Sequence, residues 1–203
     1  VPFKQVLTEH PKTLILGIVA GICTFVVFYL TTVFALALGA TKPGYSGNEF
    51  IIMELIATLF FALFIPLSAV MAEKFGRKNS SIFICVLAAL FGLTFNPLLG
   101  SGNMMGVLLF LCLGMAIMGL TYGPIGTVLS EIFPTSVRYT GSALTFNFAG
   151  SFGASFAPFI ATSLATDHGL GAVGLYLSVA SIISLVAFML LRETKSVDVN
   201  NQI

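Results

Sequence analysis

Six long apolar stretches constrain this sequence more than any other feature. An α-helix needs about 20 apolar residues to cross a hydrocarbon core of about 30 Å. The six stretches that meet this requirement are Thr13–Leu38, Phe50–Ala72, Ser80–Leu99, Met104–Leu129, Gly141–Ala165 and Ala172–Leu191. Only 8% of the residues are charged and the mean hydropathy is +1.03, whereas soluble domains carry roughly 25% charged residues. The sequence therefore predicts an all-α integral membrane protein with six transmembrane helices in a lipid bilayer.

The positions of lysine and arginine predict how these spans are oriented. Six spans place both termini on one side of the membrane, and cytoplasmic connectors retain positive charge during insertion. Only Lys42 falls on the opposite side. The basic residues on the side of the termini are Lys4, Lys12, Lys74, Arg77, Lys78, Arg138, Arg192 and Lys195. We therefore expect both termini in the cytoplasm and an inner (plasma) membrane location, with a cytoplasmic segment at 1–12, the helical bundle at 13–191 and a cytoplasmic tail at 192–203.

Residue usage gives no support to catalysis, metal binding or nucleic-acid binding. The net charge of +1 suggests no nucleic-acid partner. The cysteines Cys23, Cys85 and Cys112 lie in separate apolar runs, where they are expected to pack as small apolar groups. His10 and His168 lie in polar connectors, away from any cysteine. With no nucleophile beside a base and no phosphate-binding glycine loop, the sequence predicts a protein that is not an enzyme and uses no cofactor or metal.

Three polar residues inside the predicted spans are candidates for contact with a solute or a proton. Glu54 qualifies because an ionisable group in a span is costly to bury. It lies near the external end of its span, so an interfacial or structural role is the alternative. Tyr122 either packs as an aromatic side chain or donates a hydrogen bond to a polar solute. Asn147 needs a partner at its depth, which is either another helix or the solute.

Prolines and small residues predict where the spans bend and where they pack closely. We expect bending at Pro66, Gly123, Pro124 and Pro158, because proline removes a backbone donor. Gly119 stands four residues before Gly123, which creates a groove on one helix face. Bendable helices near a central cavity are a recurring device of secondary transporters.

Two further patterns concern helix faces. Gly17 and Gly21 have the spacing that lets another helix approach, either within the bundle or in a dimer. In the fifth span, one stripe should face lipid and the opposite stripe should face protein or a cavity. The first stripe is Phe148, Phe152, Phe156 and Phe159, and the second is Asn147, Gly150, Ala154 and Pro158.

Two segments of the sequence carry a resemblance to a known family. In AEKFGRK (72–78), the residues Lys74, Gly76, Arg77 and Lys78 match the loop signature of the major facilitator superfamily. Ala69 stands where that signature has a glycine, and Glu73 where it has an aspartate. The segment 121–144 resembles the metabolite:proton symporter branch. Its matching residues are Tyr122, Gly123, Pro124, Glu131, Phe133, Pro134, Val137, Arg138, Tyr139 and Gly141.

This resemblance covers the whole chain as the C-terminal six-helix half of a twelve-helix fold, built from two inverted three-helix repeats. It implies proton-coupled symport of a small polar organic solute by alternating access. The partners implied are the missing N-terminal six-helix half, the solute and protons. A sugar-porter-like facilitator of the same fold is one alternative, and a non-transporting membrane assembly subunit is another. Because the chain begins at Val1 rather than Met, we interpret it as a fragment or a processed product.

Charges at the cytoplasmic ends of the spans are interpreted as a gate whose pairing differs between outward-open and inward-open states. Arg77 can hold a carboxylate bidentately, and a second ion pair is expected between Glu131 and Arg138. The predicted network comprises Glu73, Lys74, Gly76, Arg77, Lys78, Glu131 and Arg138. The alternative is that these charges only fix the topology at the membrane face.

Overall fold

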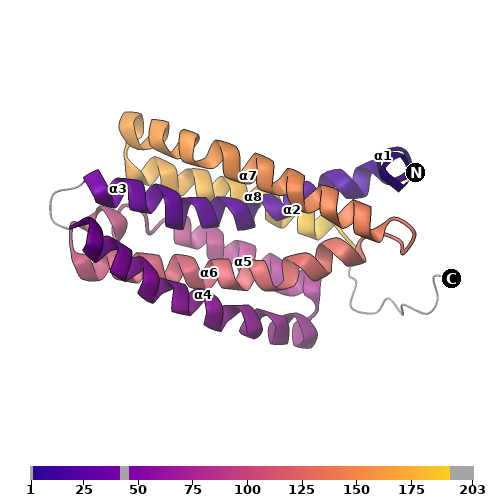
Figure 1. The fold of residues 1–203 in the computed structure, drawn as a ribbon, viewed down its shortest axis with the longest axis horizontal. Coiled ribbons are helices and arrows are strands. Elements are labelled where there is room, and N and C mark those ends of the chain that lie inside the picture. Colours follow the sequence, from indigo (N-terminus) through magenta and orange to yellow (C-terminus); the bar gives the residue numbers. More distant parts are fainter. Residues whose placement is uncertain (1, 42–45, 193–203) are drawn as a thin grey trace.

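Helices account for every regular element in the part of the chain that the structure describes. The computed structural model describes residues 2–41 and 46–192. Its elements are α1 (Pro2–Glu9), α2 (Pro11–Tyr29), the π-helical turn η1 (Leu30–Phe34), α3 (Ala35–Thr41), α4 (Gly47–Phe75), α5 (Arg77–Gly92), the 3-10 turn η2 (Leu99–Ser101), α6 (Met104–Glu131), α7 (Arg138–His168) and α8 (Leu170–Leu190). The long helices run side by side, with α1 and the end of α8 at the same end of the bundle (Figure 1).

The predicted apolar stretches all coincide with helices, but one differs in extent. Five helical segments are long and apolar enough to cross a membrane: Pro11–Thr41, Gly47–Phe75, Met104–Glu131, Arg138–His168 and Leu170–Leu190. The boundaries predicted for the third stretch were wrong. Its helix, α5, has 16 residues, about 24 Å at the α-helical rise, and ends at Gly92 rather than Leu99. Pro97 contributes to this early end, because the residue before a proline is disfavoured in helical conformation.

A wide turn interrupts the first long helix where the sequence gives no break. The N–H of Ala35 donates to the carbonyl of Leu30, five residues earlier, which is the π-helical pattern. The hydroxyl of Thr32 donates to the carbonyl of Phe28 at 2.7 Å, so a side chain supplements the backbone bonds near this turn. The helix therefore continues through α2, η1 and α3 with a changed register.

Close approach between α2 and α7 explains the paired glycines of α2. A Cβ added at Gly17 would lie 2.7 Å from Cγ2 of Thr145, and one added at Gly21 would lie 2.8 Å from Cβ of Ala149. Real Cβ atoms do not approach this closely, so both positions require glycine for the packing seen here. Of the two alternatives for the Gly17 and Gly21 spacing, packing within the bundle is confirmed.

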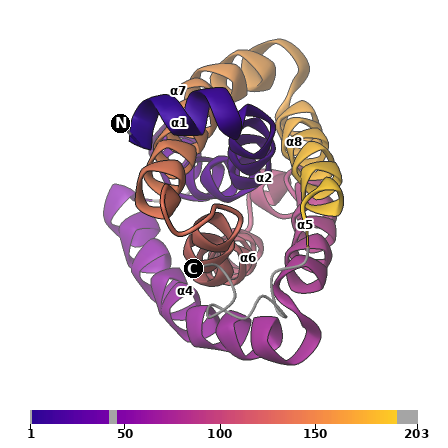
Figure 2. The same cartoon turned by 90° about the vertical axis from the view of Figure 1, so that its right-hand side faces the viewer.

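Helices α5 and α8 pack even more closely and form one flank of the bundle (Figure 2). A Cβ added at Gly174 would collide with the carbonyl oxygen of Gly92. One turn further along α8, the hydroxyl of Ser178 donates to the carbonyl of Ala89 at 2.7 Å. Backbone contact and an interhelical hydrogen bond thus hold α5 against α8 along this seam.

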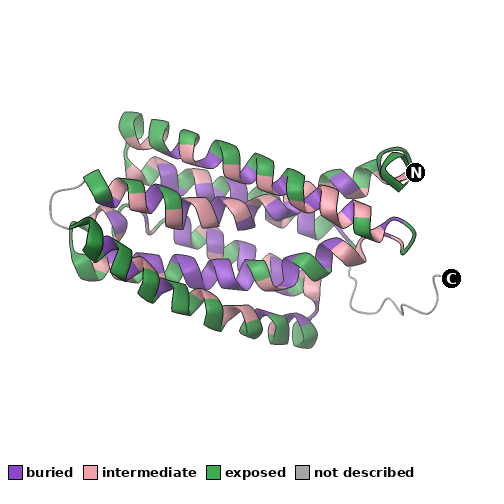
Figure 3. Cartoon of the chain, viewed as in Figure 1, coloured by how far each residue is buried: buried purple, intermediate pink, exposed green. Residues whose placement is uncertain are grey.

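The phenylalanine stripe of α7 lies on the outside, as predicted. Its exposed fractions are 44% for Phe148, 51% for Phe152, 54% for Phe156 and 78% for Phe159. Green exposed positions follow this outer edge of α7, whereas α6 is mostly buried (Figure 3). The bundle therefore presents apolar surface outward, which suits a hydrocarbon environment.

Prolines lie inside three continuous helices: Pro66 in α4, Pro124 in α6 and Pro158 in α7. Bending at these positions stays a prediction. The groove predicted on α6 is confirmed, because a Cβ at Gly119 would lie 2.6 Å from the carbonyl oxygen of Phe61. Gly123 lies against Ser68, which belongs to α4 as Phe61 does. The glycines of α6 therefore serve as the contact face for α4.

Candidate functional site

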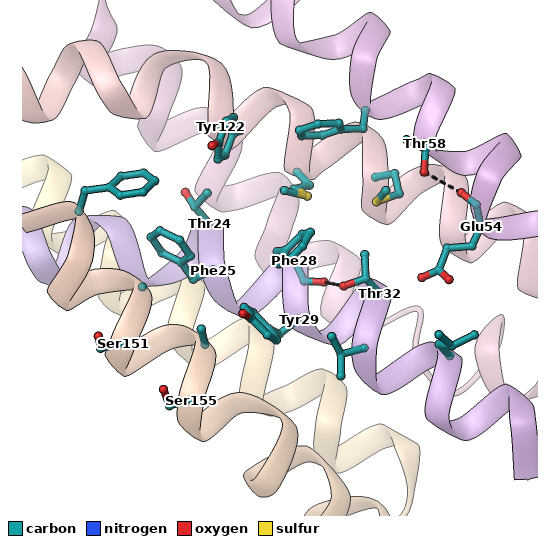
Figure 4. A pocket seen from close by; sticks show the side chains of 18 of the residues that line it. Thr24, Phe25, Phe28, Tyr29, Thr32, Glu54, Thr58, Tyr122, Ser151 and Ser155 are labelled. Atoms are coloured by element: carbon teal, nitrogen blue, oxygen red, sulfur yellow. Dashed lines mark hydrogen bonds between the residues drawn. The ribbon is translucent and has the colours of Figure 1, made fainter. Parts of the chain in front are cut away.

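A cavity of about 1060 Å³ lies between α2, α4, α6 and α7 (Figure 4). Apolar helix faces form most of its wall, and polar side chains enter it from each of these four helices. From α2, η1 and α3 it is lined by Thr24, Phe25, Phe28, Tyr29, Thr32, Val33 and Leu36. From α4, α6 and α7 it is lined by Ile51, Glu54, Leu55, Thr58, Phe61, Met115, Met118, Tyr122, Phe146, Asn147, Gly150, Ser151, Ala154 and Ser155. A volume of this size suits a small organic molecule.

The three polar residues singled out from the sequence meet in this cavity. Glu54 comes from α4, Tyr122 from α6 and Asn147 from α7. Tyr122 is 42% exposed and packs edge-to-face with Phe61, with ring centroids 5.9 Å apart. Its ring is packed while the residue still lines the cavity, so the two interpretations of Tyr122 are compatible. Helices far apart in the sequence have therefore brought an acid, a phenol and an amide to one place.

Asn147 satisfies part of its hydrogen-bonding need within its own helix. Its Nδ2 donates to the carbonyl of Ala143 at 2.8 Å, one turn back along α7. The sequence suggested a partner on another helix or a solute, and the structure shows this local partner instead. Gly150 and Ala154 line the same cavity, so the small-residue stripe predicted on α7 does face a cavity at these positions.

Sequence reasoning missed the hydroxyl groups of the cavity. These are Thr24, Thr32, Thr58, Ser151 and Ser155. Two of them could have been predicted from helical spacing, because Ser151 and Ser155 follow Asn147 at intervals of four residues and therefore share its face of α7. The position of Thr32 depends on the π-helical turn, for which the sequence carries no clear signal.

The predicted charge network includes an ion pair between Arg77 and Glu131 at the end of the bundle. Nη2 of Arg77 lies 2.9 Å from Oε1 of Glu131, and each side chain is 26% exposed. The pair joins the first residue of α5 to the last residue of α6. The second carboxylate oxygen of Glu131, Oε2, is buried without a hydrogen-bond partner among the described residues. Two of the charges predicted to interact are therefore in contact.

Arg138 does not form the ion pair expected of it. The prediction that Glu131 pairs with Arg138 was wrong, because Glu131 contacts Arg77 instead. Nε of Arg138 donates to the carbonyl of Phe133 at 3.4 Å, within the turn that connects α6 to α7. Proximity in sequence across Pro134 suggested a partner for Glu131 that differs from the one in the structure.

The other members of the predicted network have separate environments. Lys78 donates from Nζ to the carbonyls of Met189 at 2.7 Å and Leu191 at 2.8 Å, at the end of α8. This is favourable because the end of a helix carries negative partial charge. Lys74 lies over the ring of Phe75, 5.4 Å from its centroid.

The turn between α4 and α5 depends on a glycine, and the acid before it points outward. Gly76 adopts φ 92° and ψ 150°, a conformation that other residues rarely adopt. It is buried at this tight junction, whereas Glu73 is exposed and belongs to no ion pair within the described ranges. The four-charge arrangement of Glu73, Arg77, Glu131 and Arg138 is thus reduced to one pair in this structure.

Residues 20–202 match the family described as Major Facilitator Superfamily. The chain belongs to this family. It is 43% identical over 200 residues to the inner membrane metabolite transport protein YhjE of Escherichia coli, a match covering 96% of this chain and 46% of that protein. It is also 27% identical over 193 residues to a citrate-proton symporter of Klebsiella pneumoniae, covering 94% and 44%. A proline/betaine transporter of Salmonella typhimurium is 26% identical over 198 residues, covering 96% and 39%.

Membership of the major facilitator superfamily confirms the resemblance seen in the loop signature and in the segment 121–144. Because this is a family of membrane transporters, it also confirms that the chain belongs to no enzyme class. The chain spans less than half the length of each of these three relatives.

Proposed function

We propose that the chain is the six-helix C-terminal half of a proton-coupled transporter that moves a small polar organic solute by alternating access. The observation that carries this proposal is the convergence of Glu54, Tyr122 and Asn147 on one cavity of about 1060 Å³. The names of the relatives support the solute class and proton coupling, because they include a citrate-proton symporter and a proline/betaine transporter. An N-terminal half would cover the open side of this cavity.

The number and direction of the spans belong to the same proposal. We assign α5 as the sixth span, short at 16 residues and extended by the turns that follow it. Support comes from the common end of the bundle shared by α1 and the end of α8, which six crossings require (Figure 1). The two inverted three-helix repeats, the inner membrane and the cytoplasmic termini are part of the proposal, and the relative named as an inner membrane protein supports the location.

Transport is tested with the complete protein that contains this chain, reconstituted into proteoliposomes. Uptake of radiolabelled citrate, proline and betaine is measured with and without an imposed pH gradient. A symporter gives uptake that the inward proton gradient accelerates. Uptake that ignores the gradient would favour the facilitator alternative. If no solute is taken up and none raises the unfolding temperature, the assembly-subunit alternative replaces the proposal.

We also propose that the Arg77–Glu131 pair closes the cytoplasmic end in one state of the cycle and separates in the other. It joins the start of α5 to the end of α6, so a change in the spacing of these helix ends would break it. A proton or solute then shifts the two states only by stabilising one of them more than the other. Glu73, Lys74, Gly76, Lys78 and Arg138 are the remaining predicted members of the gate.

The gate is tested by neutralising the pair and by exchanging its charges. Arg77→Gln and Glu131→Gln should each lower uptake at normal membrane abundance, and the exchanged variant Arg77→Glu/Glu131→Arg should recover part of it. Glu9→Gln is the control, because Glu9 is an exposed acid on α1. Normal uptake in both single variants removes the gate. Loss of abundance in step with loss of uptake leaves only the role in topology.

A further inference from the structure

Among the described residues that line the cavity, Glu54 is the one charged side chain, and its charge is negative. Its 21 lining residues include Glu54 but no lysine, arginine or histidine. Figure 4 shows the carboxylate of Glu54 directed into the cavity, toward the side on which Phe28 and Thr32 lie. Within residues 2–41 and 46–192, no cationic side chain lies at ion-pair distance from Glu54. A carboxylate that faces a cavity without a cation from this part of the protein attracts a positive group from a ligand.

The aromatic side chains of the cavity favour the same kind of ligand. Six of them line it, arranged as three edge-to-face pairs. The centroid distances are 5.1 Å for Phe25 and Phe146, 5.1 Å for Phe28 and Tyr29, and 5.9 Å for Phe61 and Tyr122. The face of an aromatic ring carries negative charge density and attracts ammonium groups.

The threonine hydroxyls beside Glu54 also present acceptors to the cavity. Thr32 donates its hydroxyl proton to the carbonyl of Phe28 at 2.7 Å, and Thr58 donates to the backbone carbonyl of Glu54 at 2.9 Å (Figure 4). Since each hydroxyl has one proton, what remains for a ligand is the lone pairs of the oxygen. This region therefore offers a carboxylate, ring faces and hydroxyl oxygens, and all three favour a ligand that is a cation or an N–H donor.

We propose that this wall of the cavity is a subsite for the cationic group of the solute, an ammonium or quaternary ammonium. The Glu54 carboxylate binds it from α4, and the rings of Phe28 and Tyr29 bind it from α2. The inference rests on the proposed function in taking the cavity as the solute site. It goes further by assigning the charge that this half of the cavity selects.

The test measures binding, which does not depend on transport. The complete protein that contains this chain is purified, and its thermal unfolding is followed with choline and with 3,3-dimethylbutan-1-ol. The two probes have nearly the same shape, and only choline is charged. A ligand that binds the folded protein raises the unfolding temperature. Choline should raise it in a saturable manner, and the neutral alcohol should have no effect at the same concentration.

Variants of the subsite make the assignment specific. Glu54→Gln should weaken choline binding by at least about ten-fold, roughly 1.4 kcal/mol. Phe28→Leu should weaken it by several-fold, whereas Phe28→Tyr, which retains a ring face, should bind choline like the unmodified protein. The matched control is Glu49→Gln, which removes the same charge from the first turn of α4. Glutamine can maintain the capping box at that position, so choline binding should not change.

Two results would overturn the subsite: stabilisation by the neutral alcohol equal to that by choline, or unchanged choline binding in Glu54→Gln. If Glu54→Gln retains choline binding and loses uptake driven by the pH gradient, Glu54 carries protons and the subsite is rejected, while the proposed transport stands. If choline binds with the predicted dependence on Glu54 but no solute is transported, the transport function fails and the subsite is supported.

Discussion

The flank formed by α5 and α8 and the side formed by α4 and α7 use small residues in opposite ways. On the first, Gly92 and Gly174 bring two helix backbones into contact. On the second, Gly150 and Ala154 line a cavity of about 1060 Å³. Figure 2 shows α5 and α8 adjacent, with α4 and α7 on the other side of the bundle. A small residue thus closes an interface where a backbone fills its space, as at Gly174, whereas Ala154 and Gly150 border the cavity, Gly150 with the ring of Phe25 beside it.

The largest expected effect on stability comes from enlarging a side chain at the contact between α5 and α8. Gly174→Val would force side-chain atoms into the carbonyl of Gly92, and overpacking of this kind costs about 3 kcal/mol. We expect a matching loss of unfolding free energy in detergent, together with a lower yield of folded protein. Gly171→Ala on the same helix is the control, because an added Cβ there meets nothing within 4 Å. Equal destabilisation by both variants would show that the seam is not tightly packed.

The next effect concerns the link from the start of α5 to the end of α8. Lys78→Met keeps the apolar stem of the side chain but removes both charged hydrogen bonds to the carbonyls of Met189 and Leu191. We expect a loss of about 1–2 kcal/mol, since Lys78 is partly exposed and charged hydrogen bonds are worth roughly this much. Urea unfolding of the complete protein measures it. Lys12→Met, at an exposed position of α2, should leave the unfolding free energy unchanged. An equal loss in Lys12→Met would contradict a stabilising role of the Lys78 hydrogen bonds.

A smaller loss is expected from the hydrogen bond within the seam. Ser178→Ala removes the donor to the carbonyl of Ala89, and interhelical hydrogen bonds in membrane proteins average about 0.6 kcal/mol. Ser163→Ala is the comparison, because Ser163 is exposed on α7 and bonds only to Asp167 in its own helix. A double variant of Ser178→Ala with Gly174→Val should lose less than the sum of the two changes, since both act on one interface.

The smallest effect on stability, near zero, is expected for a substitution that lines the cavity. Ser155→Cys places a thiol in the cavity, where it should react with a water-soluble maleimide without altering the unfolding temperature. Of the three native thiols, those of Cys23 and Cys85 are buried in the bundle and should stay unreacted, and Cys112, which is partly buried, is first replaced by serine. If the new thiol at position 155 reacts with the maleimide as little as Cys23 does, the cavity is closed to water.

Much of the fold follows from the sequence because apolar length and glycine spacing are local signals. The positions of the five long apolar helices, the outward phenylalanine stripe of α7 and the packing of Gly17 and Gly21 within the bundle were predicted correctly, whereas α1 was not predicted as a helix. The end of α5 at Gly92 was not predicted, because the apolar stretch continues to Leu99 although Pro97 disfavours helix at the residue before it. The apolar composition continues past the end of α5 because Phe95 and Leu99, in the turns that follow, are buried.

The candidate site could be predicted only in part. Glu54, Tyr122 and Asn147 stood out as polar residues in apolar spans, and they do meet in one cavity. Which acid pairs with which base was not predictable, since the partner of Glu131 is Arg77 on α5 and not Arg138, which is close in sequence. Pairing across helices depends on the path of the connectors, and a single sequence does not contain that information.

The π-helical turn at Leu30–Phe34 also changes how this span should be compared between proteins. One extra residue in a helical turn rotates everything after it by about 100° relative to the wheel set by the residues before it. A helical wheel drawn from Pro11 through Thr41 is therefore out of phase beyond Phe34. A relative that lacks the wide turn would align with this chain only if one position were left as a gap, and its threonines would occupy different faces.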